Sequence, residues 1–117
     1  MSTIGFSWKE ADDTPEGRRA ALALSEMVMN RSLARLLEAD ERAVEEPPAW
    51  REASTGTQNV VWVTADELDA LNTEIREVVM RHHARLADPA SRPSGSRLCE
   101  LVAWGVPTYL PGQEPTP

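Results

Sequence analysis

The chain has little lysine and little cysteine, and both shortages limit what it can do. Its 117 residues include one lysine beside eleven arginines, and nineteen acidic residues bring the net charge to −7. A surface that binds phosphates needs clustered positive charge, so we expect no direct binding of nucleic acid by this chain alone. The only cysteine, Cys99, cannot form an internal disulfide, and its apolar neighbours predict a buried, unreactive thiol.

Long apolar runs are missing as well. No stretch approaches the roughly 18 apolar residues that cross a membrane, and the acidic start lacks the basic and apolar regions of a signal peptide. The sequence therefore predicts a cytoplasmic protein with no membrane partner.

The sequence also lacks the motifs of common catalytic and metal sites. It contains no H-x-x-x-H pair, no glycine-rich phosphate loop, no G-x-S-x-G and no cysteine with spaced histidines. His82 and His83 are adjacent, so on a helix they point about 100° apart and cannot both hold one metal ion. We expect neither an enzyme nor a bound metal or cofactor.

Hydrophobic periodicity predicts an α+β fold. Alternating apolar residues predict a strand at 3–9, and apolar runs predict strands at 60–63 and 98–110. Helical patterns occupy residues 15–44 and 65–86. The expected architecture is a small three-stranded sheet with two long helices packed on it, in β-α-β-α-β order. One domain would span residues 1–110, followed by a disordered tail at 111–117.

The second helix has the clearest start signal. Thr64 and Glu67 have the spacing of a capping box, in which each side chain accepts a hydrogen bond from the other residue's backbone amide. Apolar residues then recur at three- and four-residue steps, which predicts one buried face. The residues on this face are Leu68, Leu71, Ile75, Val78, Val79, His82 and Leu86.

The first helix is expected to start at Asp13 or Thr14, with Pro15 in its first turn, and to end before the proline pair at 47–48. Its N-terminal half is apolar nearly all round, so it needs cover on two sides. We expect a second subunit to supply one of them, which makes the chain a homodimer. The candidate dimerisation residues are Leu22, Leu24, Met27 and Val28.

A second interpretation is a small-molecule binder or small enzyme. Its pocket would lie between sheet and helices and would be lined by Trp62, His82 and Trp104, with Met27 beside them. Only the presence of these large side chains supports it, and no ligand can be named.

Four motifs in a fixed order resemble a known family. In this order the chain is similar to the C-terminal half of ArsR-like winged-helix transcriptional regulators of actinobacteria, over about residues 6–107. The motifs are P-A-W-R at 48–51, V-V-W-V-T-A-D-E-L at 60–68, R-L-A-D-P-A-S-R-P at 85–93 and W-G-V-P at 104–107.

The resemblance implies a dimerisation or effector-sensing module of a transcriptional regulator. The DNA-binding winged helix that precedes this region in the family is absent, so no DNA-contacting residue can be assigned. The module is expected either to be cut from a longer gene product or to stand alone, with an unknown small-molecule effector.

Overall fold

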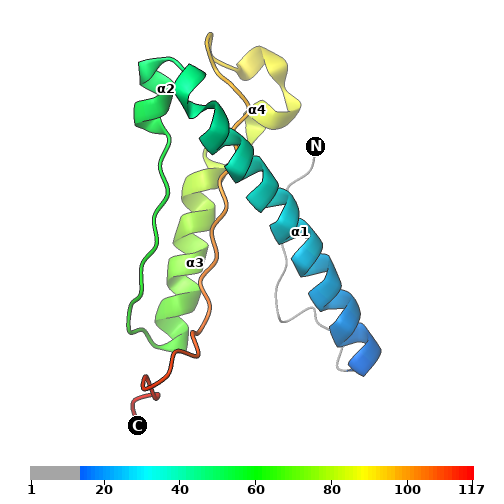
Figure 1. Ribbon diagram of the computed structural model, residues 1–117, viewed down its shortest axis with the longest axis vertical. Helices are drawn as coiled ribbons and strands as arrows, with labels where there is room; N and C mark the ends of the chain where they lie inside the picture. The colour runs from blue at the N-terminus through cyan, green and yellow to red at the C-terminus, as the bar shows by residue number, and fades with distance from the viewer. Residues whose placement is uncertain (1–13) are drawn as a thin grey trace. The chain divides into compact units, whose positions relative to one another are not determined.

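The computed structural model describes residues 14–117, and the elements that it forms there are helical (Figure 1). The predicted α+β fold is wrong for this part of the chain, because no strand and no sheet forms within residues 14–117. The predicted strand at 3–9 lies outside the described residues. Contacts divide the chain into two units, residues 1–58 and 59–117.

The first unit contains α1 (Pro15–Arg42), the short 3-10 helix η2 (Ala43–Glu45) and α2 (Pro48–Ala53). Thr14 is the N-cap of α1, and its Oγ1 accepts a hydrogen bond of 3.0 Å from the backbone amide of Gly17. Pro15 occupies the first turn, where its missing amide hydrogen costs nothing. The predicted start at Thr14 is confirmed, and helical structure ends at Glu45, close to the predicted end.

The short helix α2 lies outside both predicted helices, which were placed at 15–44 and 65–86. Pro48 supplies the explanation, since proline at the first helical position favours a helix start just as it prevents continuation of the helix before it. Trp50 lies within α2 and is half-buried.

The second unit contains α3 (Ala65–Met80), α4 (Ala84–Ala87) and the 3-10 helix η3 (Pro89–Ser91). The predicted capping box is confirmed: Thr64 accepts from the amide of Glu67 at 3.2 Å, and Glu67 Oε1 accepts from the amide of Thr64 at 2.9 Å. The predicted continuous helix at 65–86 is interrupted by a turn at residues 81–83. At the end of α4, the guanidinium of Arg92 donates to the backbone oxygens of Arg85 and Leu86, at 2.7 and 2.9 Å.

The two described segments that were predicted as strands, residues 60–63 and 98–110, form no strand. A strand forms only when its backbone finds a ladder partner, and an apolar run without strict alternation, such as residues 98–110, does not specify which residues should pair. The last segment instead runs alongside α3, where the side-chain amide of Asn72 donates a hydrogen bond to the Gly105 oxygen (Figure 1).

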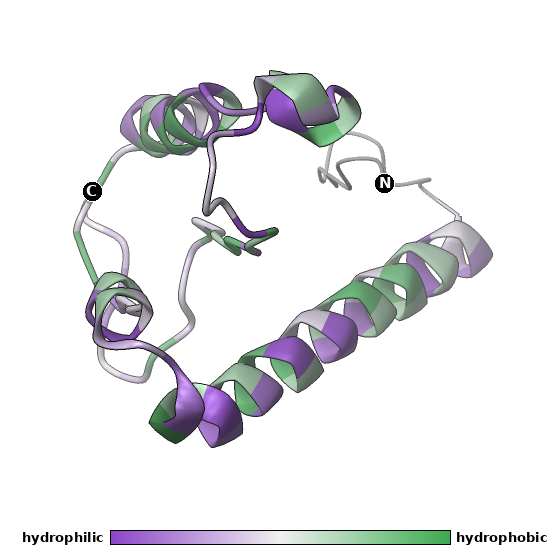
Figure 2. Ribbon diagram, turned by 90° about the horizontal axis from the view of Figure 1, so that it is seen from above, coloured by the Kyte–Doolittle hydropathy of each residue, from purple (hydrophilic) through white to green (hydrophobic). Residues whose placement is uncertain are grey.

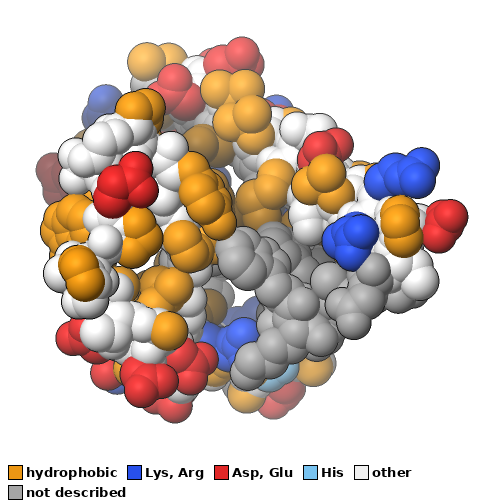
Figure 3. All heavy atoms as spheres, turned by 90° about the horizontal axis from the view of Figure 1, so that it is seen from below, with side chains coloured by type: hydrophobic (Ala, Val, Ile, Leu, Met, Phe, Trp, Pro, Cys, Tyr) orange, Lys and Arg blue, Asp and Glu red, His pale blue; other side chains and the backbone are white. Residues whose placement is uncertain are grey.

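No residue within 14–117 is buried, so the predicted buried face of the second helix is not seen either. Leu71 and Ile75 remain 40% and 44% exposed, while Leu68 and Leu86 are half-buried. Figure 2 shows apolar and polar residues interspersed along α1, and Figure 3 shows many hydrophobic side chains at the surface. The described chain therefore presents apolar faces that its own residues leave largely uncovered.

Candidate association surface

Helix α1, which is 28 residues long, carries several exposed apolar side chains. Leu22, Leu33 and Leu36 are 60%, 51% and 64% exposed. At about 100° per residue, these three and the half-buried Met29 fall within roughly 60° of one another around the helix. We name the set Leu22, Met29, Leu33 and Leu36 the α1 seam.

The four predicted dimerisation residues do not share one face of α1. By the same helical geometry, Leu24, Met27 and Val28 lie on the side away from the seam, whereas Leu22 belongs to it. Leu22, Leu24 and Met27 are exposed, and Val28 is half-buried. A single partner helix can therefore cover Leu22 or the other three, but not all four.

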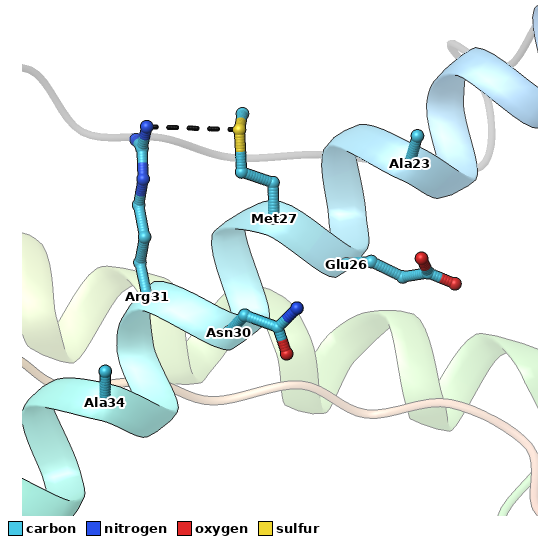
Figure 4. Close-up of a pocket in the computed structure, with 6 residues that line it drawn as sticks. All are labelled: Ala23, Glu26, Met27, Asn30, Arg31 and Ala34. Carbon is cyan, nitrogen blue, oxygen red and sulfur yellow. Dashed lines mark hydrogen bonds between the residues drawn. The ribbon is translucent and has the colours of Figure 1, made fainter.

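A shallow hollow lies on a third side of α1 (Figure 4). Its described lining comes from this helix and includes Glu26, Asn30 and Arg31. Arg31 Nη2 lies 3.9 Å from Met27 Sδ, and both side chains point to the same side in Figure 4, with Glu26 and Asn30 turned away from them. The hollow is lined by one exposed helix, and its lining includes charged side chains. It therefore encloses no volume in which a small molecule could be buried.

The three predicted ligand-binding residues belong to three different segments of the second unit. Trp62 precedes α3 in an extended segment, His82 lies in the turn between α3 and α4, and Trp104 lies in the last extended segment. All three are exposed, and none lines the hollow on α1 or the smaller hollow on α2 beside Pro48. Residues 14–117 form no sheet that could supply one wall of the predicted pocket.

No metal centre is formed by the described residues. Within 14–117 no group of three or more His, Cys, Asp or Glu side chains is placed to hold a metal ion. Cys99 is exposed, with its Sγ 3.5 Å from the Arg97 oxygen, so the predicted burial of this thiol is wrong. The apolar run that contains Cys99 does not pack into a core, and the thiol is left at the surface.

Two interactions in the second unit had no usable sequence signal. Asn72 Nδ2 donates to the Gly105 oxygen at 3.1 Å, across 33 positions of sequence. A Cβ atom added to Gly105 would lie 2.7 Å from Asn72 Oδ1 and 3.0 Å from Leu68 Cδ1, so a larger residue here would force these side chains or the last segment to shift.

None of the helices formed by residues 14–117 has both the length and the apolar character that a membrane crossing requires. Comparison of the chain with protein-family models, with curated proteins and with solved structures finds no match.

Proposed function

We propose that this chain is a self-association module that pairs with a second copy through α1. The observation that carries the proposal is the α1 seam: three leucines on one face of a capped 28-residue helix, each more than half exposed. Apolar surface of this kind is stabilised when it is removed from water, by roughly 25 cal/mol for each Å² covered. Exposed apolar patches on a helix commonly mark protein interaction sites.

A second copy fits this surface because the α1 seam is flanked by charges of opposite sign at its two ends. Arg19 lies near the start of α1, and Asp40 lies near its end. Two copies of one helix can satisfy both charges at once when they pair in opposite directions, whereas a uniformly acidic or basic partner would satisfy only one.

Self-association is also what the resemblance to winged-helix regulators implies for this region, so the proposal extends to the dimerisation part of such a regulator. Support for that extension comes from the sequence motifs and not from the fold, because neither of the implied strands within the described residues forms. No structural observation favours the small-molecule binder, whose three residues Trp62, His82 and Trp104 are exposed and line neither hollow.

The experiment is a mass measurement by light scattering after gel filtration, over protein concentrations from about 1 to about 100 µM. The proposal predicts a mass near twice 12.9 kDa at the upper end of the range, falling toward 12.9 kDa on dilution. A mass of 12.9 kDa throughout would contradict it, because the seam would then need no second copy.

A further inference from the structure

The residues on and around the α1 seam follow a seven-residue repeat. One set consists of Leu22, Met29 and Leu36, and the other places Arg19, Glu26, Leu33 and Asp40 at the same interval. Two positions separated by three and four residues and repeating every seven form the contact line of two paired helices, the a and d positions of a coiled coil. Here three of the four positions in the second set are charged.

These charges distinguish the two directions in which the helices can pair. In a parallel pair, equivalent positions face each other, so Arg19 would meet Arg19, Glu26 would meet Glu26 and Asp40 would meet Asp40. Three like-charge contacts would then lie in the interface. In an antiparallel pair, each position of one set faces the other set, and no charge meets its own copy.

We infer that two copies of α1 pair antiparallel about a twofold axis lying between Met29 and Leu33. This inference rests on the proposed self-association and adds the direction and the contact residues. In this register Met29 faces Leu33 of the partner subunit, Leu22 faces Asp40 of the partner subunit, and Leu36 faces Glu26 of the partner subunit. Arg19 lies one helical turn, about 4.5 Å along the axis, from Asp40 of the partner subunit, which is within reach of an arginine side chain.

The relative direction can be measured by cross-linking with a bismaleimide of about 10 Å span. The background is Cys99→Ser, because that thiol is exposed and would react. In the antiparallel pair, Leu22→Cys mixed with Leu36→Cys brings the two thiols to within ~6 Å along the axis, whereas Leu22→Cys alone leaves them ~27 Å apart. We expect cross-linked dimer from the mixture and none from Leu22→Cys alone.

A charge reversal tests the same geometry without a cross-linker. Arg19→Glu should raise the dimer dissociation constant about fivefold at low salt, since it replaces two attractive contacts by two repulsive ones. Adding Asp40→Arg to that variant should restore the dissociation constant to within about twofold of the parent. Arg31→Glu, on the side of α1 away from the seam, is the matched control and should have no effect beyond about twofold.

The outcomes distinguish the antiparallel register from self-association itself. A wild-type chain that stays monomeric overturns both. A wild-type dimer in which Leu22→Cys cross-links to itself, or in which Asp40→Arg fails to rescue Arg19→Glu, overturns the antiparallel register and leaves self-association standing. A dimer in which neither cross-linking pair reacts shows that the α1 seam is not the interface. Circular dichroism of each variant checks that the helix content is unchanged.

Discussion

The side-chain amide of Asn72 donates a hydrogen bond of 3.1 Å to the backbone oxygen of Gly105, which joins the last extended segment to the middle of α3. This contact takes the place of the strand pairing that the sequence predicts for residues 98–110. It is a single polar contact to a glycine, and single substitutions at either residue can test it.

Gly105→Ala should release the last segment from α3. The added Cβ would lie 2.7 Å from Asn72 Oδ1, closer than such contacts normally occur, so the Asn72 side chain or the backbone at 105 must shift, and either shift disturbs the hydrogen bond between them. We expect amide hydrogen exchange at residues 98–107 to become faster, by an amount matching a cost of roughly 1–3 kcal/mol. Gly56→Ala is the control, because nothing lies within 4 Å of its added Cβ. Unchanged exchange in Gly105→Ala would show that the segment does not pack on α3.

Asn72→Ala should loosen the same segment while leaving α3 nearly as stable. The lost hydrogen bond contributes about 0.5–1.5 kcal/mol, but alanine favours the helix over asparagine by up to about 0.7 kcal/mol. The two effects oppose each other in helix melting and act on different residues in hydrogen exchange. Faster exchange at 98–107 with little change in the melting of α3 is the expected pattern, and a large loss of helix would argue that Asn72 acts through α3 instead.

Thr64→Ala should destabilise α3 by about 1 kcal/mol, because it removes the side chain that accepts from the Glu67 amide. The measurement is the loss of helical circular dichroism with temperature or urea. Thr57→Ala, in the extended segment before α3, is the control for removing a threonine hydroxyl. Equal stability of the two variants would mean that the capping box contributes nothing.

Arg92→Met should unravel α4 locally, since the guanidinium donates to two carbonyl oxygens of this helix, those of Arg85 and Leu86. A hydrogen bond from a charged donor contributes about 1.5–3 kcal/mol to stability. Because Arg92 is exposed to water, we expect its two hydrogen bonds together to contribute only about 1 kcal/mol. Exchange at residues 84–91 reports the effect. Arg76→Met, on the exposed side of α3, controls for the loss of one positive charge.

The parts of the fold that were predictable from sequence are those determined by local chemistry. Thr14 with Pro15, and Thr64 with Glu67, set helix starts through contacts within three residues, and both appear as predicted. The predicted strands at 60–63 and 98–110 are wrong, because strand formation depends on a partner segment that is distant in the sequence. Arg92 could not be assigned to the end of α4, because its role depends on how the turn at 88–91 folds back.

The candidate surface was predictable in part. The apolar N-terminal half of α1 led to the prediction that a second subunit covers it, and the four residues chosen from it lie on different sides of the helix. Leu22 belongs to the α1 seam and Leu24 does not, a distinction that follows from counting positions around the helix. Only the structure shows that Leu33 and Leu36 are exposed, because the sequence alone does not show which face of a helix stays in contact with water.

The most direct test of self-association through α1 is the sedimentation equilibrium mass of two matched variants, Leu36→Asp and Leu24→Asp. Both place the same charge on the same helix at leucines that are 64% and 52% exposed, but only Leu36 lies on the α1 seam. If the α1 seam is the interface, Leu36→Asp sediments as a 12.9 kDa monomer. Leu24→Asp stays at twice that mass, as the wild-type chain does. Equal masses for the two variants, or a dimer lost only in Leu24→Asp, would contradict it.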